Sequence, residues 1–244
     1  SGDYQLYYFI ADLHSLTGEM SAAERRRQIT VTAAELIAAG MDPERLTLFV
    51  QSQVPEHTEL TWILSAVTPV SALQRMTQFK NKAERQAKNI NAGLFTYPVL
   101  QAADILLYHA TLVPVGEDQA QHLELTNDIV RAFNRRYGEY FAAIKPLFTK
   151  TARIMSLLTP EKKMSKSLGA DHVLELADEP TAIERKLTRA VTATAGGEKS
   201  PGAANLLLLL QAFAPGETYQ KFAEAEHQGN IRYAMAFVYD AAGE

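Results

Sequence analysis

The sequence predicts an α/β protein: a Rossmann-like, doubly wound parallel sheet with a second, smaller all-helical domain. Short β-rich apolar runs alternate with longer helical patterns in the first half of the chain. The part after residue 170 has helical patterns and no further strand pattern. The chain has 244 residues, of which 47% are hydrophobic, which is enough to bury a substantial core.

A βαβ unit opens the chain. Residues 7–11 are apolar and β-rich and predict a strand, and a helix is expected over 22–39 because Gly40 ends its pattern. Residues 46–51 are a continuous apolar run, which is typical of a strand covered on both faces. Strand, helix and strand in this order indicate parallel pairing.

The same alternation continues further along. Pro98 is expected to open a helix through Tyr108, residues 112–115 lead into a glycine turn, and 119–135 have one apolar helical face. Helices are also expected over 180–193 and 201–213. In such folds, ligands bind at the carboxyl ends of the strands.

Composition excludes several classes of protein. The net charge is −4, from 24 Lys and Arg against 28 Asp and Glu, so no global basic field indicates nucleic acid. There are no cysteines, which excludes disulfides and thiolate metal sites. No apolar run reaches transmembrane length, and we expect a cytoplasmic protein without a membrane partner.

A polar stripe lies on the helix that follows Pro98. Tyr97, Gln101, Asp104 and Tyr108 are spaced i, i+4, i+7 and i+11, beside an apolar stripe. Asp104 either faces water on an amphipathic helix or accepts a hydrogen bond from a substrate N–H or O–H inside a pocket. Spacing leaves both alternatives open.

Two further segments lie at strand ends. Residues 116–119 (GEDQ) separate a strand from a helix, where they are either a ligand-binding turn or a plain helix start capped by Asp118. His14 also follows a strand and is expected at the same rim; a lone histidine is usually structural.

The segment 162–169 (KKMSKSLG) is rich in lysine and serine. Lys163 and Lys166 are three positions apart, and Ser165 and Ser167 add hydroxyl and N–H groups, so the loop can bind a triphosphate. A second basic segment includes Lys82. Most basic runs are solvated faces, so composition alone is weak evidence.

Five segments in order resemble the bacterial tryptophanyl-tRNA synthetases of class I. The Lys-Met-Ser-Lys-Ser sequence resembles the second class I signature, and it follows an α/β domain and precedes a helical one. The other segments are 49–57 (FVQSQVPEH), 76–80 (MTQFK), 97–108 (YPVLQAADILLY) and 113–119 (VPVGEDQ). The resemblance implies a catalytic domain over 1–160, a signature loop over 161–170 and an incomplete tRNA anticodon-binding region over 171–244.

The resemblance also implies residue roles. Asp104 would accept the indole N–H of tryptophan, and Tyr97 and Gln119 would bind its amino and carboxylate end. The remaining residues implied for the tryptophan pocket are Gln101, Val113, Val115 and His14. Those implied for ATP are Gly116, Glu117, Asp118, Ile154, Lys163, Met164, Ser165, Lys166 and Ser167, with Lys163, Lys166 and Lys82 on the phosphates.

The implied activity is a tryptophan–tRNA ligase. It would use ATP with Mg²⁺ to form tryptophanyl-adenylate and then charge tRNA(Trp), acting as a homodimer with no resident metal. The first class I signature should precede Tyr7 and is not in the sequence, so we expect a portion of a longer protein. One alternative is a tyrosine-specific relative, because some family members have methionine in place of the polar Gln101, and tyrosyl enzymes bind a phenol with a similar Tyr, Gln and Asp arrangement. Two others are a non-catalytic paralogue and a nucleotidylyltransferase.

Overall fold

The structure is a computed structural model. It describes residues 4–77, 90–116, 119–148, 154–175, 177–192, 201–214 and 216–227. The chain divides into two compact units, 1–149 and 150–244, so that the described residues 154–160 belong to the second unit and not, as predicted, to the first domain.

The predicted βαβ unit is confirmed. Strand β1 (Tyr7–Ile10) pairs in parallel with β2 (Thr47–Val50), and the short helix η1 (His14–Thr17) and α1 (Ala22–Ala38) connect them. The Ser21 side chain caps α1 by accepting a hydrogen bond from the Glu24 N–H. Gly40, with φ +94°, follows the helix end in the left-handed conformation that glycine adopts without strain. The capped helix thus returns the chain beside β1.

Helix α5 (Ala92–Leu106) begins earlier than the sequence predicts. The prediction that Pro98 opens this helix is wrong, because Pro98 lies inside it. The Asn91 side chain accepts a hydrogen bond from the Leu94 N–H at 2.9 Å and caps the first turn. The cap and the burial of this helix outweigh the backbone hydrogen bond that a proline removes. Tyr97 is therefore held on a continuous helix together with Asp104.

A second parallel strand pair follows α5. Strand β3 (Leu112–Pro114) pairs with β4 (Lys145–Leu147), which has no counterpart in the predicted elements. Helix α6 (Ala120–Tyr137) connects the two strands. The Asn127 side chain fixes the return of the chain, because it accepts from the N–H of Ile144 and donates to its carbonyl. The pairing places the carboxyl end of β3 beside the start of α6.

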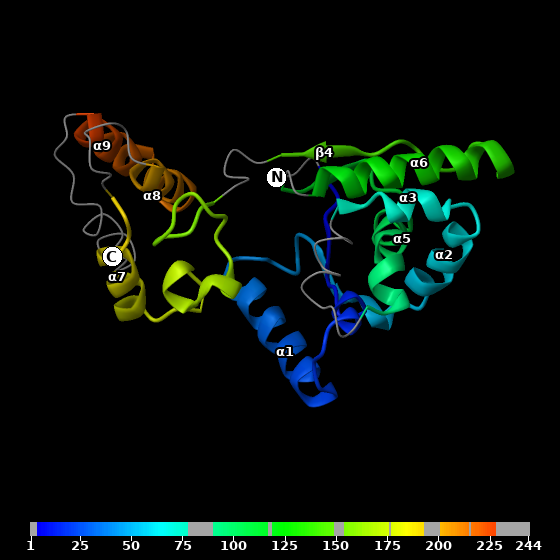
Figure 1. Cartoon of the computed structure of the whole chain (residues 1–244), viewed down its shortest axis with the longest axis horizontal. Helices are drawn as coiled ribbons and strands as arrows, with labels where there is room; N and C mark the ends of the chain where they lie inside the picture. The colour runs from blue at the N-terminus through cyan, green and yellow to red at the C-terminus, as the bar shows by residue number, and fades with distance from the viewer. Residues whose placement is uncertain are drawn as a thin grey trace. The chain divides into compact units, whose positions relative to one another are not determined.

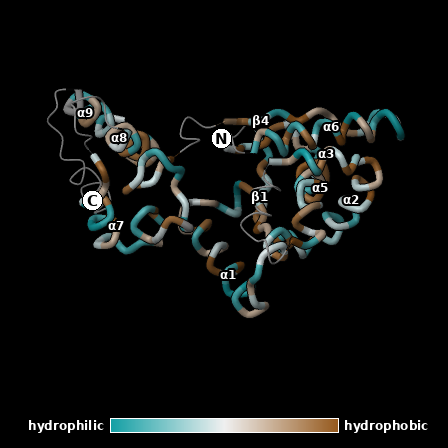
Figure 2. Tube along the Cα trace, viewed as in Figure 1, coloured by the Kyte–Doolittle hydropathy of each residue, from teal (hydrophilic) through white to brown (hydrophobic). Residues whose placement is uncertain are grey.

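Helix α5 is the centre of the first unit. It packs against α6, against α2 (Glu56–Ser65) and against α3 (Val70–Gln74) (Figure 1). In Figure 2, hydrophobic and hydrophilic residues alternate along α6, as expected for a helix with one buried face. Among the core residues are Leu64, Val99, Ala102, Leu106, Leu123 and Ile129. Each buried leucine or isoleucine contributes about 1.5–3 kcal/mol, so this core fixes α5 firmly.

The second unit is helical in its described part. Short 3-10 helices, η4 (Lys166–Leu168) and η5 (Ala170–His172), precede α7 (Pro180–Thr188), α8 (Pro201–Phe213) and α9 (Gly216–His227). The bounds predicted for α8 are confirmed, whereas α7 ends at Thr188. No helix in the described ranges is long and apolar enough to cross a membrane.

Candidate functional site

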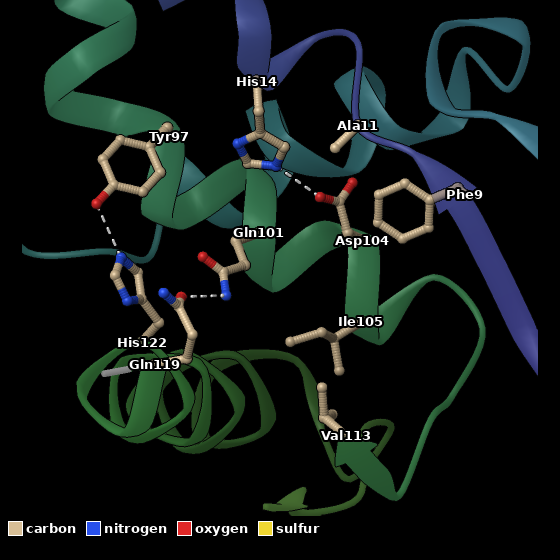
Figure 3. Close-up of a pocket in the computed structure, with 10 residues that line it drawn as sticks. All are labelled: Phe9, Ala11, His14, Tyr97, Gln101, Asp104, Ile105, Val113, Gln119 and His122. Carbon is tan, nitrogen blue, oxygen red and sulfur yellow. Dashed lines mark hydrogen bonds and ion pairs between the residues drawn. The ribbon is translucent and has the colours of Figure 1, made fainter. Parts of the chain in front are cut away.

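A pocket of about 360 Å³ lies in the first unit (Figure 3). Its walls come from the end of β1, from η1, from α5, from β3 and from the start of α6. The lining residues are Phe9, Ala11, His14, Tyr97, Gln101, Asp104, Ile105, Val113, Gln119 and His122. Six of them were singled out from the sequence: His14, Tyr97, Gln101, Asp104, Val113 and Gln119.

The structure decides between the two alternatives for Asp104. Its side chain is 3% exposed and lies in the pocket, so it is not a water-facing group of an amphipathic helix. Tyr97 and Gln101 project from the same helix into the same pocket (Figure 3). Tyr108 follows the helix end, and its hydroxyl lies 2.9 Å from Nε2 of His57 instead of lining the pocket.

Asp104 is held ionised by hydrogen bonds. Nε2 of Gln51 lies 2.7 Å and Nδ1 of His57 2.6 Å from Oδ1, and Nε2 of His14 lies 2.8 Å from Oδ2. Burial alone raises the pKa of Asp104, but the bonds from His14, His57 and Gln51 and the charge of His14 outweigh it and bring the pKa below its ordinary value. The pocket therefore contains a buried carboxylate.

Tyr97 presents a neutral phenol. Its hydroxyl lies 2.9 Å from Nε2 of His122, and both side chains are buried. Desolvation raises the pKa of Tyr97 to about 12, because burial disfavours the phenolate. At neutral pH this hydroxyl is therefore protonated and available as a hydrogen-bonding group on the pocket wall.

Two amides form the polar side of the pocket opposite the apolar residues. Nε2 of Gln101 lies 3.4 Å from Oε1 of Gln119, which is a long hydrogen bond (Figure 3). The N-cap position of α6 is occupied by Gln119 and not, as predicted for a plain helix start, by Asp118. Ile105 and Val113 provide apolar walls. The pocket thus combines one carboxylate and several neutral polar groups with apolar surface, as expected for a small polar ligand with an apolar body.

Other predicted residues lie elsewhere or outside the described part. Val115 packs against the core of the first unit, and Gly116 accepts a hydrogen bond from the Gln119 N–H at 3.0 Å; neither lines the pocket. Glu117, Asp118 and Lys82 lie outside the described residues. In the ranges that are described, no group of His, Asp or Glu side chains is arranged to hold a metal ion.

The lysine-rich segment lies in the second unit. Met155 and Lys163 form an antiparallel bridge, and the Met164 N–H donates to the Ile154 carbonyl at 3.0 Å, so the segment is closed at its base. The Lys166 ammonium is exposed and lies 2.6 Å from the Glu175 carboxylate. Ser165 accepts the Leu168 N–H through its carbonyl.

The base of this segment is attached to α8. Asn205 of α8 is 5% exposed and forms two hydrogen bonds with the backbone of Met155, both of 2.7 Å. Its Oδ1 accepts from the N–H, and its Nδ2 donates to the carbonyl. Ile154 and Met164 also pack against the apolar cluster that includes residues of α8. The position of the loop base therefore depends on α8.

Three polar residues of the pocket region were missed by sequence reasoning about sites: Gln51, His57 and His122. All three are buried, with exposed fractions of 0%, 0% and 1%. The signal that was available is the position of Gln51 at the carboxyl end of a predicted strand, where ligand-binding groups gather in this fold class. His57 and His122 each lie in a helix and carry no comparable positional signal.

Comparisons with known proteins show the family to which the chain belongs. The family model described as tRNA synthetases class I (W and Y) matches residues 2–236. Tryptophan--tRNA ligase 2 of Streptomyces avermitilis is 49% identical over 214 residues, which are 84% of this chain and 64% of that protein. The chain therefore spans about two thirds of the length of that relative.

Solved structures show the same fold. Tryptophanyl-tRNA synthetase of Mycoplasma pneumoniae matches with a TM-score of 0.85 and 34% identity, covering 97% of this chain and 74% of that one. The Campylobacter jejuni enzyme, solved with ADP and tryptophan, matches with a TM-score of 0.75 and 30% identity, covering 96% and 73%. The predicted Rossmann-like α/β class is confirmed, and the chain belongs to the family of class I tRNA synthetases for W and Y.

Proposed function

We propose that the protein that carries this chain is a tryptophan–tRNA ligase. It activates L-tryptophan with ATP and transfers the tryptophanyl group to tRNA(Trp). The observation that carries the proposal is the ionised, buried Asp104 in a half-apolar pocket, because an acceptor of this kind selects a ligand with an apolar body and a hydrogen-bond donor. The 49% identity to a tryptophan–tRNA ligase supports the same substrate.

In this proposal the pocket binds the amino acid. Asp104 accepts the indole N–H, and Tyr97 and Gln119 bind the amino and carboxylate end, which the neutral Tyr97 hydroxyl and the Gln119 amide are suited to do. His14 and Val113 contribute walls. Val115 has an indirect role, because it packs against the core of the first unit two positions after Val113.

ATP is the second proposed substrate. Gly116, Glu117, Asp118, Ile154 and Met164 bind its adenosine part in this proposal. Lys82, Lys163 and Lys166 bind the phosphates, and Ser165 and Ser167 contribute further contacts. Mg²⁺ arrives bound to the phosphates, as is usual for a cation that keeps much of its water. The exposed ammonium of Lys166 supports a phosphate-binding role, since it is accessible at the surface, where it lies 2.6 Å from the Glu175 carboxylate.

The chemistry requires no covalent enzyme intermediate. A carboxylate oxygen of tryptophan attacks the α-phosphorus of ATP, the bond from that phosphorus to the bridging oxygen breaks, and pyrophosphate leaves. A ribose hydroxyl of the terminal adenosine of tRNA then attacks the carbonyl carbon, and AMP leaves. Positioning of the reactants and stabilisation of phosphate charge supply the catalysis.

Amino-acid-dependent exchange of pyrophosphate into ATP tests the proposal. We expect exchange with tryptophan and little with tyrosine. Exchange with tyrosine alone would support the tyrosine-specific candidate, for which the polar Gln101 in the pocket is the observation in favour. Binding of tryptophan without exchange, in the 244-residue chain and in a form extended to the length of the relative, would support a non-catalytic paralogue.

Lys166 offers a sharper test of the phosphate role. Lys166→Ala is expected to lower the rate of adenylate formation far more than the affinity for ATP, because the lysine stabilises charge that develops as pyrophosphate leaves. Glu175→Ala removes the partner of Lys166 but leaves the ammonium in place, and serves as the matched variant. Equal losses of rate and ATP affinity in Lys166→Ala would contradict this role.

A second copy of the chain is the proposed protein partner, forming a homodimer. The observation that supports an apolar contact surface is the exposure of Trp62, Ile63 and Val70, on α2 and at the start of α3. Light scattering coupled to size-exclusion chromatography measures the mass in solution. Trp62→Glu is expected to shift the mass from that of a dimer toward that of a monomer.

A further inference from the structure

One oxygen of Asp104 has both of its acceptor positions occupied by protein donors. Its Oδ1 accepts from Nε2 of Gln51 at 2.7 Å and from Nδ1 of His57 at 2.6 Å, and both donors are fully buried. The orientation of the Gln51 amide is fixed, because its Oε1 accepts from the Leu13 N–H at 3.1 Å. Two donors occupy the two lone pairs of this oxygen. A ligand can therefore reach Asp104 only through Oδ2.

The second oxygen has one acceptor position left. Nε2 of His14 lies 2.8 Å from Oδ2, and His14 and Asp104 both line the pocket (Figure 3). An ionised carboxylate oxygen accepts about two hydrogen bonds in its plane. Asp104 therefore offers one further acceptor position to a bound molecule.

A chain of hydrogen bonds continues behind the carboxylate. Because the ionised Asp104 only accepts, Nδ1 of His57 carries a hydrogen, and Nε2 of the same ring lies 2.9 Å from the Tyr108 hydroxyl. Desolvation, followed by the charge of Asp104, raises the pKa of Tyr108, so this hydroxyl keeps its proton at neutral pH. Neither His57 nor Tyr108 is among the described residues that line the pocket.

Aromatic packing fixes this chain in place. The Tyr108 ring stacks on Tyr7 with centroids 4.9 Å apart, and the His57 ring lies 5.6 Å from Phe9 and 6.0 Å from Phe49. His57 opens helix α2, which packs against α5. Little rotamer freedom is left to His57, so its Nδ1–H has one direction, toward Asp104.

We propose that His57 and Tyr108 are positioning residues that set the direction and hydrogen-bonding strength of the open Asp104 oxygen, and thereby the selection of an N–H donor. The identity of the ligand rests on the proposed function. The relay, which is the chain of hydrogen bonds from Tyr108 through His57 to Asp104, rests on the distances between these side chains. In this proposal the Tyr108 hydroxyl donates to Nε2 of His57, which polarises the imidazole and strengthens the hydrogen bond from Nδ1–H. Loss of the Tyr108 hydroxyl therefore weakens the support of Asp104 without changing the pocket lining.

The decisive variant is Tyr108→Phe, compared with Tyr7→Phe as a matched control. Both changes remove one phenol hydroxyl from the same stacked pair, but the Tyr7 hydroxyl accepts from the exposed Gln5 side chain, whereas the Tyr108 hydroxyl lies 2.9 Å from Nε2 of His57. The ligands are L-tryptophan and its benzothiophene analogue, in which sulfur replaces the indole N–H. Calorimetry measures the Kd of each ligand.

We expect Tyr108→Phe to weaken tryptophan binding about three- to tenfold, the effect of one neutral hydrogen bond, and to leave analogue binding unchanged. Tyr7→Phe is expected to change neither Kd. Equal losses for both ligands would show that Tyr108 acts through packing, and no loss for tryptophan would show that the relay has no effect. Either result overturns the proposal. In a His57→Asn background, which removes the acceptor for Tyr108, Tyr108→Phe is expected to have no further effect.

A measurement without ligand separates this proposal from the proposed function. The carboxyl ¹³C signal of Asp104 reports its titration in the free protein. Tyr108→Phe is expected to raise the pKa of Asp104, because the His57 donor weakens, whereas Tyr7→Phe leaves it unchanged. An unchanged titration in Tyr108→Phe overturns the relay even if tryptophan binds. Absence of tryptophan binding to wild-type protein, with the expected titration shift present, contradicts the proposed function alone.

Discussion

Removal of the Asp104 carboxylate tests whether this side chain organises the pocket. In Asp104→Ala, the Gln51 amide and His57 Nδ1–H lose their acceptor, and both side chains are fully buried. An orphaned buried donor costs about 1–3 kcal/mol, so the two together destabilise the protein by about 2–6 kcal/mol. His14 adds little, because its side chain is 22% exposed and water can replace the lost acceptor.

Asp104→Asn is the matched variant. Its amide oxygen still accepts from Gln51 and His57, while its NH₂ group replaces the oxygen that faces the part-exposed His14. The charge assistance and the acceptor for His14 are therefore lost, and we expect a cost of about 1–2 kcal/mol. Urea unfolding followed by circular dichroism measures both variants at neutral pH. The loss is a large part of the 5–15 kcal/mol typical of a domain, so it is readily detected. An Asp104→Ala protein as stable as wild type would refute the argument that this network holds the pocket.

Three further predictions concern charge and the second unit. The pKa of Asp104 is below its ordinary value of 3.8, so the stabilisation that its charge gives the folded protein is complete above pH 3.8 and is lost as the pH falls below it. Below pH 3.8, the unfolding free energy of Asp104→Asn should therefore depend less on pH than that of the wild type. Lys186→Met leaves the Asp178 carboxylate without its buried partner, 2.6 Å away, and should cost about 2–4 kcal/mol in thermal or urea unfolding, whereas the double variant with Asp178→Asn recovers part of that loss. Asn205→Asp places a carboxylate oxygen against the Met155 carbonyl and should cost about 1–3 kcal/mol in unfolding free energy. Asn205→Gln has the same groups on a longer side chain and tests whether the length of the side chain matters. Equal stability of the wild type and both variants would contradict the view that Asn205 holds the Met155 backbone.

Local signals allowed the βαβ unit and α8 to be predicted. An apolar run, a periodic helix and a glycine stop are all contained in adjacent residues, as at Gly40. The start of α5 was mispredicted because two local signals compete there: proline favours a first turn, and Asn91 favours an N-cap. Strand β4 was missed because Lys-Pro-Leu is short and contains a residue that strands avoid.

The pocket residues on one helix could be predicted, but their partners could not. Spacing alone places Tyr97, Gln101 and Asp104 on one stripe. Spacing does not decide whether that stripe faces water. The burial of the stripe depends on the helices that pack around α5, which are α2, α3 and α6. Gln51 and His57 lie 53 and 47 positions from Asp104, so tertiary packing brings them together: Gln51 follows β2, and His57 lies on α2, which packs on α5.

The preference between tryptophan and tyrosine depends on Gln101 more than on Asp104. An indole N–H and a phenol O–H each donate one hydrogen bond, so one open acceptor position on Asp104 serves both. A phenol oxygen also accepts, and in the pocket Nε2 of Gln101 is engaged only through a 3.4 Å bond to Gln119 that costs little to give up. An apolar side chain at position 101 would leave a bound phenol oxygen without this donor.

Gln101→Met is therefore expected to weaken tyrosine binding about tenfold, while tryptophan binding changes less than threefold, because indole has no acceptor for Gln101 to satisfy. Calorimetry with both amino acids gives the ratio of the two Kd values. Gln101→Glu is the matched polar variant: it keeps the length of the side chain but removes the donor, so it should also weaken tyrosine binding. If Gln101→Met weakens tryptophan binding more than tyrosine binding, then Gln101 contacts the amino or carboxylate end instead, and selection of the ring rests on the shape of the apolar walls formed by Ile105 and Val113.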